Sequence, residues 1–419
     1  MGKRIVIVGG GIIGMFAAYY AAQDGHDVTV VERDNEQREN FSTGNAGMIV
    51  PSHFTPLAAP GMVKLGLKWM WNPRSPFYIK PRMDWGLMDW VCKFWQASNQ
   101  SHVDASSPVL RDLHLASRSL YEVFVEKHGN NIGLVKRGLL MLCKTQHALN
   151  EESATAQKAV RLGILAEVLS PIGTADLEPE LSMNIRGSVY YPNDCHLSPQ
   201  LLMTQLQTIN RSLGVKFVWG TEALGWQTQG QIIHSMRTNQ GNIAADEYVL
   251  CCGSWSPQTV SDLRLNFPMQ AGKGYSLTLT QPRQLPSICS ILAEARVAVT
   301  PMSTTLRFGG TMEFAGLNTQ ITPARIQGII DAIPHYLPAF ESKDFHEIKP
   351  WCGLRPCSPD GLPYLGRTRD YSNLIIATGH AMMGLSLGPI SGMLVSEFIR
   401  GEQSSQEIDL LSPDRYRKK

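Results

Sequence analysis

The residues with the clearest chemical meaning in this chain are three glycines and one glutamate near its N-terminus. Gly9, Gly11 and Gly14 form a G-x-G-x-x-G turn, and Glu32 follows 18 residues after Gly14. The first glycine permits a tight bend, the second lets backbone N–H groups approach a pyrophosphate, and the third allows a helix to pack closely on a strand. An acid at this distance can accept hydrogen bonds from ribose hydroxyls. The pattern therefore predicts a dinucleotide site, with a chance glycine turn as the alternative.

The elements around the glycines are those that such a site needs. Residues 5–8 are predicted to form a strand, residues 15–23 an Ala-rich helix, and residues 26–31 a second strand. The N-terminus of the helix offers unpaired N–H donors and the positive end of its dipole to phosphates. We therefore add Ile12, Ile13 and Arg33 to the predicted cofactor contacts. FAD and NAD share this motif, so the motif alone leaves the dinucleotide open.

The bulk properties of the chain narrow the class of protein. Its 419 residues suggest two domains or one large α/β unit, and 43% hydrophobic with 18% charged residues is an ordinary globular composition. A formal net charge of +2 indicates no general affinity for nucleic acid or for an anionic membrane. The C-terminal cluster of Arg415, Arg417, Lys418 and Lys419 is expected to be a solvated tail.

Location and metal content are also predicted. The first strand begins so early that we expect no signal peptide, and no stretch approaches the roughly 20 apolar residues that span a bilayer. The eight cysteines include no C-x-x-C pair, so we expect core thiols in a reducing cytoplasm and no metal. A redox pair of Cys352 and Cys357 is the minor alternative.

The order of elements suggests two interleaved domains. Residues 40–60 are predicted as loop, residues 61–127 as helices, and residues 267–348 as mostly strand with a helix near 323–332. Further elements are expected at strands 134–144, 188–191, 248–252 and 374–377, at a helix capped by Ser198 with Pro199 in its first turn, and at a helix over 388–400.

This layout predicts an α/β fold in which a dinucleotide-binding domain alternates with a strand-rich α+β substrate domain. The first is assigned to 1–130, 196–262 and 350–419, and the second to 131–195 and 263–349.

Four further segments identify a family. They are S-T-G-N-A-G-M at 42–48, C-C-G-S-W-S at 251–256, G-L-R-P-C-S-P-D-G-L-P at 353–363, and G-H-A-M-M-G-L at 379–385. Together with the N-terminal turn they resemble the FAD-dependent D-amino acid oxidase superfamily, most closely its bacterial D-amino acid dehydrogenase branch. The resemblance covers nearly the whole chain with its blocks in the correct order. It implies FAD as the cofactor and a Rossmann-like FAD-binding domain.

The resemblance also implies which residues contact FAD. The Asn-Ala-Gly loop would lie along the isoalloxazine ring, the strand-ending turn would approach the adenosine part, and the last segment would present N–H groups to the flavin N1–C2=O edge. The residues carried over are Thr43, Gly44, Asn45, Ala46, Gly47, Met48, Gly253, Trp255, Gly379, His380, Gly384 and Leu385. An ordinary turn at Gly253 and a structural role for His380 are the alternatives.

Arg355 of the G-L-R-P segment is the predicted substrate-binding residue. In the resembled family this arginine binds the substrate carboxylate, and a planar guanidinium matches a carboxylate with two parallel hydrogen bonds. The alternative is a salt bridge from Arg355 to Asp360. Tyr275 is expected to add a hydroxyl at the carboxylate or to close the pocket, and His53 to line the cavity; packing is the alternative for Tyr275.

The implied reaction is oxidative deamination of a small-molecule D-amino acid in amino acid catabolism. The α-hydrogen passes as hydride from Cα to flavin N5, the imino acid hydrolyses to a 2-oxo acid and ammonia, and quinone, oxygen or another acceptor takes the electrons. Alternatives are oxidation of a secondary amine such as hydroxy-D-proline or sarcosine, or of glycine. An NAD(P)H-dependent flavoprotein and a flavin-bound assembly subunit are less favoured, since no second dinucleotide motif follows.

Residues 61–95 combine aromatic and basic side chains. They contain Trp69, Trp71, Trp85, Trp90 and Trp95 among Lys64, Lys68, Lys80, Arg82 and Lys93. Such a mixture suits peripheral contact with the inner face of the cell membrane, with aromatic rings in the interface and lysines at phosphates. Packing in a helical core or at a subunit contact is the equal alternative.

Overall fold

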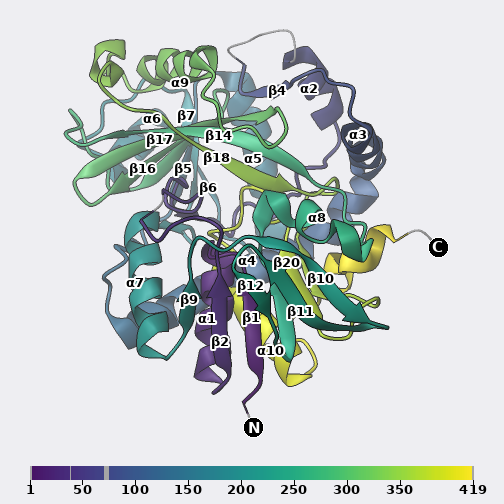
Figure 1. Ribbon diagram of the computed structural model, residues 1–419. Helices are drawn as coiled ribbons and strands as arrows, with labels where there is room; N and C mark the ends of the chain where they lie inside the picture. Colours follow the sequence, from purple (N-terminus) through teal and green to yellow (C-terminus); the bar gives the residue numbers. More distant parts are fainter. Residues whose placement is uncertain (1, 38, 70–74, 418–419) are drawn as a thin grey trace.

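The computed structural model describes residues 2–37, 39–69 and 75–417, and it has two lobes, each built on one large sheet (Figure 1). The lower lobe in Figure 1 carries the N-terminus and a mostly parallel sheet, and the upper lobe carries a larger mixed sheet. The chain passes between the lobes several times, because strands of each sheet come from separated parts of the sequence. The α/β fold class is thus confirmed. The exact division at residues 130, 195, 262 and 349 stays a prediction.

The sheet of the lower lobe has six strands. In spatial order they are β19 (Tyr364–Arg367), β20 (Leu374–Thr378), β13 (Glu247–Leu250), β1 (Arg4–Val8), β2 (Asp27–Val31) and β9 (Lys216–Val218). All neighbouring pairs are parallel except β19 with β20. These strands read as continuous apolar runs because helices cover one face and a three-stranded sheet packs on the other. That small sheet consists of β10 (Ala223–Gln229), β11 (Ile232–Thr238) and β12 (Gly241–Ile243).

Close packing of two helices supports the first glycine turn. Helix α1 (Ile12–Gln23) is apolar on all sides and almost wholly buried, and α10 (Gly388–Arg400) lies directly against it. A Cβ at Gly392 would lie 2.6 Å from the backbone carbon of Phe16, so this contact needs glycine. Helix α7 (Pro199–Ser212) packs on α1 from another side, and Ser198 caps it as predicted, accepting a hydrogen bond from the Leu201 N–H.

The sheet of the upper lobe has nine strands. In spatial order they are β18 (Trp351–Cys357), β14 (Gln270–Leu279), β17 (Thr305–Phe314), β16 (Val297–Met302), β15 (Cys289–Leu292), β5 (Leu139–Cys143), β7 (Gly187–Tyr191) and β6 (Glu167–Leu169), with β4 (Phe77–Ile79) beside β17. Helix α9 (Pro323–Tyr336) packs on one face, against Leu277 and Phe308. We call this the far face. The other, the cavity face, carries Ser276, Arg307 and Arg355, and it looks toward the lower lobe.

The remaining helices lie around the two sheets. They are α2 (Met62–Trp69), α3 (Trp85–Ala97), α4 (Gln100–His128), α5 (Gln146–Arg161), α6 (Pro171–Leu177) and α8 (Ser256–Thr259). Three of them fall in the region predicted to be helical, but β4 interrupts that region. No helix in the described part of the chain combines the length and the apolar character that crossing a bilayer would require.

Candidate functional site

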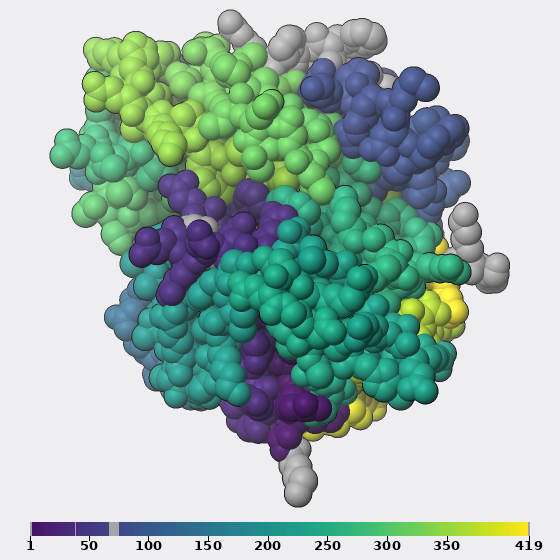
Figure 2. All heavy atoms as spheres, in the orientation of Figure 1, coloured from purple at the N-terminus to yellow at the C-terminus, as the bar shows by residue number. Residues whose placement is uncertain are grey.

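One cavity of about 450 Å³ joins most of the sequence-predicted residues. It runs from the N-terminal turn, past the loop around Asn45, to the start of the segment before α10 and to β18. In Figure 2 the purple N-terminal segment lies between the teal part of the lower lobe and the green upper lobe. The predicted residues that line the cavity are Gly9, Gly11, Ile12, Ile13, Glu32, Arg33, Asn45, Gly253, Trp255, Arg355, His380, Gly384 and Leu385.

The three glycines of the turn differ in the contact that an added side chain would make. Gly9 has φ +107°, and a Cβ there would lie 2.5 Å from the carbonyl oxygen of Cys251. A Cβ at Gly14 would lie 2.0 Å from the carbonyl oxygen of Gly9, so Gly14 brings α1 against β1 and does not line the cavity. At Gly11 the nearest atom to an added Cβ is Ser42 Oγ at 3.7 Å, and φ is an ordinary −75°. The protein itself does not require glycine here, whereas a pyrophosphate in the cavity would.

Glu32 and an aromatic stack line the cavity beside the turn. The Glu32 carboxylate accepts hydrogen bonds from the N–H groups of Gly10 at 2.8 Å and Asp34 at 3.1 Å, which aims it across the turn. Phe41 and Trp255 are stacked with centroids 5.4 Å apart, and the Arg33 guanidinium lies 3.8 Å from the Trp255 ring centroid. Phe41 was not predicted, although it stands in the loop that carries the Asn-Ala-Gly motif. The Trp255 ring is thus already in contact with the Phe41 ring and the Arg33 guanidinium.

The segment before α10 lines the opposite end of the cavity. Gly379 has φ +80° and is packed on Tyr364, so it shapes the turn without lining the cavity. His380 is buried, its Nε2 lies 2.9 Å from Ser391 Oγ, and burial lowers the pKa of its imidazole to about 3. His380 is therefore neutral. Within the described residues, no hydrogen-bond partner takes the N–H groups of Gly384 and Leu385, and both residues face the cavity.

The Asn-Ala-Gly loop is docked onto the cavity face of the upper sheet. A Cβ at Gly44 would lie 2.1 Å from the Trp351 ring, and Arg307 Nη1 donates to the carbonyl oxygens of Thr43 at 2.8 Å and Asn45 at 2.7 Å. Burial lowers the pKa of Arg307 to about 10. Arg307 was missed because its place depends on strand register.

Most residues of this loop hold the backbone in place and do not line the cavity. Gly47 has φ +80°, and a Cβ there would lie 2.4 Å from the Leu197 carbonyl oxygen. Met48 pairs with His196 in the short β3 (Met48–Ile49) and β8 (Cys195–His196) ladder, and Ala46 lies against Gly309. Of the predicted residues in this loop, Asn45 is the one that lines the cavity.

Arg355 lies at the inner end of the cavity. Its guanidinium crosses Gly274, where a Cβ would lie 2.1 Å from Nη1, and Nη1 donates to the Thr311 carbonyl oxygen at 2.7 Å. Thr311 has φ +64° and belongs to a register shift between β14 and β17. Burial lowers the pKa of Arg355, and among the residues that the structure describes no carboxylate forms an ion pair with it. A half-buried guanidinium that lines the cavity and has no counter-charge suits an anionic ligand.

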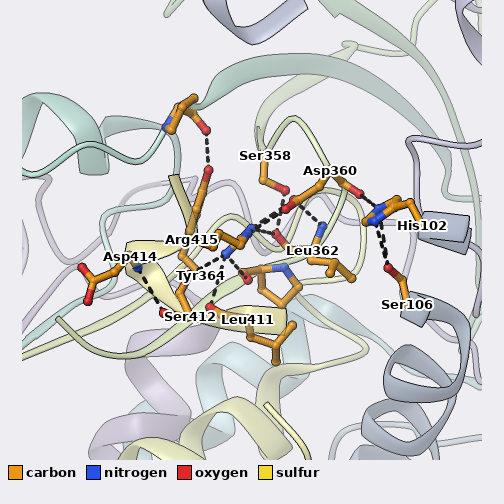
Figure 3. A network of polar contacts seen from close by, with 12 residues as sticks. His102, Ser106, Ser358, Asp360, Leu362, Tyr364, Leu411, Ser412, Asp414 and Arg415 are labelled. Atoms are coloured by element: carbon orange, nitrogen blue, oxygen red, sulfur yellow. Dashed lines mark hydrogen bonds and ion pairs between the residues drawn. The ribbon is translucent and has the colours of Figure 1, made fainter. Parts of the chain in front are cut away.

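The predicted alternative, an Arg355–Asp360 salt bridge, is wrong. Asp360 pairs with Arg415, whose Nε and Nη2 donate to the two carboxylate oxygens at 2.6 and 3.0 Å (Figure 3). Burial alone would raise the pKa of Asp360, but the charge and hydrogen bonds of Arg415 lower it. The expectation of a solvated tail is also wrong for Arg415, whose side chain is mostly buried, at 13% exposed. Arg417 does pair at the surface, with Asp370, and Lys418 and Lys419 lie outside the described residues.

The structure does not bring Tyr275 to Arg355. In the β14–β18 ladder Gly272 lies opposite Arg355 and Gly274 opposite Gly353, so Tyr275 points to the far face. There its hydroxyl donates to Glu313 Oε2 at 2.8 Å and accepts from the Thr322 N–H at 3.2 Å. Strand alternation places Tyr275 behind the sheet, and this was not visible without the register.

His53 lies in a buried polar network beyond the cavity lining. Its Nδ1 is 3.2 Å from Ser52 Oγ, and both the N–H and the hydroxyl of Ser52 donate to Asp194. Burial, with Arg296 nearby, lowers the pKa of His53 to about 4, while burial raises the pKa of Asp194 to about 7. His53 is neutral and does not share the cavity with Arg355.

The cysteines and possible metal ligands add no further site. All eight cysteines are free thiols, and Cys352 and Cys357 lie on opposite faces of β18. The described residues hold no group of three or more histidine, cysteine or acidic side chains placed to bind a metal ion.

Comparisons with known proteins agree with this geometry. The chain is 31% identical over 419 residues to the D-amino acid dehydrogenase of Granulibacter bethesdensis, covering 99% of each protein. It is 29% identical over 412 residues to that of Helicobacter pylori, covering 98% of each. Its fold is similar to the crystal structure of glycine oxidase from Geobacillus kaustophilus, with a TM-score of 0.78, 21% identity and 99% of each chain covered. It is also similar to L-proline dehydrogenase from P. horikoshii, with a TM-score of 0.77, 17% identity and coverage of 99% and 98%.

The match to a family spans both lobes and the whole cavity. Residues 4–398 match the family described as FAD dependent oxidoreductase. The N–H groups of Gly384 and Leu385, which lack partners among the described residues, and the open space at Gly11 suit an extended flavin dinucleotide. The chain therefore belongs to the FAD-dependent oxidoreductase family, and it is an enzyme with FAD as its cofactor.

Proposed function

We propose that this enzyme is a D-amino acid dehydrogenase. It oxidises the Cα–N bond of a D-amino acid to an imino acid, which hydrolyses to a 2-oxo acid and ammonia, and a quinone or another acceptor takes the electrons. The observation that carries the proposal is Arg355, a half-buried guanidinium that lines the cavity and has no ion-pair partner among the described residues. The names of the sequence relatives support the same substrate class.

Arg355 is suited to fix an amino acid by its carboxylate. The Thr311 carbonyl holds Nη1, so the guanidinium plane is set before substrate arrives. Two parallel hydrogen bonds to a carboxylate would then also orient Cα. Bound FAD supplies the two-electron acceptor chemistry. The protein contributes position, exclusion of water and a neutral His380, which adds no charge to this end of the cavity.

From the same cavity lining we propose which residues contact FAD. Glu32 binds the ribose hydroxyls, Gly11 and the α1 N-terminus face the pyrophosphate, and the free N–H groups of Gly384 and Leu385 stabilise negative charge on the flavin. The α10 helix begins only at Gly388, so these two N–H groups belong to the turn before it.

Replacing Arg355 with lysine tests the substrate role. Lysine keeps the charge but loses the two-pronged geometry, so KM for the amino acid should rise by about 10- to 100-fold, as expected for charged hydrogen bonds worth roughly 1.5–3 kcal/mol. FAD should stay bound, as measured by flavin absorbance per chain. Arg417→Lys, which changes a surface ion pair with Asp370, is the matched control and should leave KM unchanged. An unchanged KM in Arg355→Lys would remove the carboxylate role.

The substrate class is tested by dye reduction with D- and L-amino acids, glycine, sarcosine and hydroxy-D-proline. Structures similar in fold include an oxidase named for glycine and a dehydrogenase named for L-proline, so a primary and a secondary amine both fit the family. Reduction by D-amino acids at lower concentration than by their L-forms supports the proposal. Reduction by glycine and N-alkyl amino acids alone favours the alternative.

We also propose that α3 contacts a membrane surface. Trp85 is 84% and Trp95 67% exposed, with Met88 and Val91 on the same exposed side, whereas Trp90 is buried at 2% and donates from Nε1 to the Cys357 carbonyl oxygen at 2.9 Å. The exposed face of α3 is therefore available for the membrane contact, whereas its opposite face packs in the protein, which was the alternative expectation. Figure 1 places α2, β4 and α3 together at one edge of the molecule, and the blue spheres of Figure 2 show this segment at the surface.

Charges at α3 are of both signs, because Lys93 pairs with the exposed Asp89 and Arg82 pairs with Asp84. Lys64 and Lys80 are exposed near this helix, and large apolar side chains with basic neighbours are typical of interfacial helices. Trp71 and the side chain of Trp69 lie outside the described residues.

Vesicle co-sedimentation tests the contact. Exchanging both Trp85 and Trp95 for glutamine should abolish binding to vesicles that contain anionic lipid. Ile172→Gln, at an equally exposed apolar residue on α6, is the control and should not change binding. Failure of the unaltered protein to co-sediment would contradict this part of the proposal.

A further inference from the structure

The C-terminal turn η5 (Pro413–Tyr416) contains a mostly buried arginine that the proposed chemistry does not use. Besides its two bonds to Asp360, Arg415 donates from Nη2 to the Leu362 carbonyl oxygen at 2.8 Å and from Nη1 to the Pro363 carbonyl oxygen at 3.2 Å (Figure 3). Its guanidinium also lies 3.9 Å from the ring centroid of Tyr364. Arg415 therefore holds the whole segment from 360 to 364 with one rigid, branched cation.

The segment that Arg415 holds continues directly from β18. Asp360 stands three residues after Cys357, the last residue of that strand, and its second role is to accept the Leu362 N–H at 3.1 Å. His102 of α4 lies with Nε2 2.8 Å from the Asp360 carbonyl oxygen. Figure 3 shows His102 and Arg415 approaching Asp360 from opposite sides. The loop after β18 is thus anchored to α4 and to the C-terminal turn.

Strand β18 depends on such anchors because it lies at the edge of its sheet. In the described part of the chain β14 is its only strand neighbour. Along its other side it is supported by the Trp90 indole, which donates to the Cys357 carbonyl oxygen, and by the Ala381 N–H, which donates to the Pro356 carbonyl oxygen at 2.9 Å. Arg355 lies two residues before the end of β18, so movement of that end would move the guanidinium.

We propose that Arg415 is a positioning residue for substrate binding: by holding Asp360 it fixes the end of β18, and thereby the place of Arg355 relative to the substrate carboxylate. This inference rests on the proposed carboxylate role of Arg355. It gives the far C-terminus a function in the site, since a misplacement of a binding group by about 1 Å can change rates by up to about 100-fold.

The test compares Arg415→Gln with Arg417→Gln in the FAD-loaded protein. Both remove an arginine that pairs with an aspartate, but Arg417 pairs at the surface with Asp370. The readouts are KM and kcat for a D-amino acid, FAD per chain, and Tm. The Kd of benzoate, used as a carboxylate probe, is read from the change in flavin absorbance. In Arg415→Gln we expect KM and the benzoate Kd to rise about tenfold, with FAD content unchanged. In Arg417→Gln we expect none of these to change.

Two further variants separate positioning from stability. Arg415→Lys keeps the charge without the fork and should give an intermediate rise in KM and Kd, and it decides the matter if Arg415→Gln fails to fold. If Arg415 acts through Asp360, adding Asp360→Asn to Arg415→Gln should raise KM and Kd no further. A purely structural ion pair would lower Tm but leave KM and the benzoate Kd unchanged well below Tm, which would overturn the proposal.

Comparison with Arg355→Lys shows which proposal fails. If Arg355→Lys raises KM and the Arg415 variants do not, the positioning role is refuted and the carboxylate role stands. If Arg355→Lys leaves both KM and the benzoate Kd unchanged, the carboxylate role fails, and a rise in the Arg415 variants would need another cause.

Discussion

One end of the cavity is formed mainly by backbone atoms and the other mainly by side chains. At the N-terminal turn the protein presents backbone, that of Gly9, Gly11 and the start of α1, where the Ile12 N–H already donates to Ser42 Oγ. At the substrate end it presents side chains from an edge strand and a register shift, chiefly Arg355 above Gly274. Backbone geometry follows from a short local motif, whereas the direction of a strand side chain follows from register across the sheet. The first kind of site can therefore be predicted from a sequence, and the second can be predicted only in part.

The largest expected effect separates two glycines of the turn. Gly14→Ala should destabilise the fold and abolish FAD loading, because its Cβ would lie 2.0 Å from the Gly9 carbonyl oxygen, and overpacking of this kind costs at least about 1–3 kcal/mol. Gly11→Ala should keep the Tm of the FAD-free protein and still bind FAD about 10- to 100-fold more weakly, because only the cofactor would meet the new methyl group. Calorimetry and FAD titration measure both. Equal FAD affinity in Gly11→Ala and the unaltered chain would contradict the cradle assignment.

Comparing expectation and structure shows where sequence reasoning ends. The glycine turn, Glu32 and the segment before α10 were predicted with their positions because each is a local pattern. Tyr275 was placed on the wrong side of the sheet, and the partner of Asp360 proved to be Arg415, 55 residues further along the chain. These depend on strand parity and on long-range contacts that no spacing reveals.

The site residues that were not predicted also depend on strand register and long-range contacts. Arg307 and Thr311 reach the Asn-Ala-Gly loop and Arg355 only because β17 runs beside β14 with a register shift. Phe41 did carry a signal, as an aromatic residue next to a glycine-rich motif, but its stacking on Trp255 required the fold. At α3, composition alone could not divide buried Trp90 from its exposed neighbours.

Glu32→Gln should have the next largest effect. Loss of a charged acceptor for ribose hydroxyls should weaken FAD binding by about tenfold or more, since hydrogen bonds to charged groups contribute roughly 1.5–3 kcal/mol. The matched control is Glu36→Gln, which removes a surface partner of Arg211 in the same region. FAD titration of the two variants should give a weaker Kd only for Glu32→Gln. A similar loss in both would point to general electrostatics in place of a specific contact.

Tyr275→Phe tests whether the Tyr275 hydroxyl serves the substrate or the stability of the fold. Since the hydroxyl binds Glu313 on the far face, KM should change by no more than about twofold, while stability should fall by about 1–2 kcal/mol because a buried carboxylate loses a donor. Steady-state kinetics and thermal unfolding measure the two effects separately. A tenfold rise in KM with unchanged stability would show that the hydroxyl serves the substrate after all.

The smallest expected effect concerns pH and a buried carboxylate outside the cavity, Asp194. Burial raises the pKa of Asp194 to about 7, from about 4 in an unfolded chain, so folding takes up a proton between these values. The contribution of Asp194 to stability is therefore complete below about pH 4 and falls as the pH rises to about 7. Asp194→Asn removes this slope.

The Tm of Asp194→Asn minus that of the unaltered protein should accordingly increase from about pH 4 to about pH 7 and then level off. His53, whose pKa is lowered by burial to about 4, favours the folded state increasingly as the pH rises toward its usual value, and this contribution cancels in the difference. The same difference for Gly11→Ala should be flat, because that glycine acts through backbone space and carries no ionisable group. A flat difference for Asp194→Asn as well would mean that Asp194 is already ionised in the folded protein at these pH values, and the raised pKa would then be refuted.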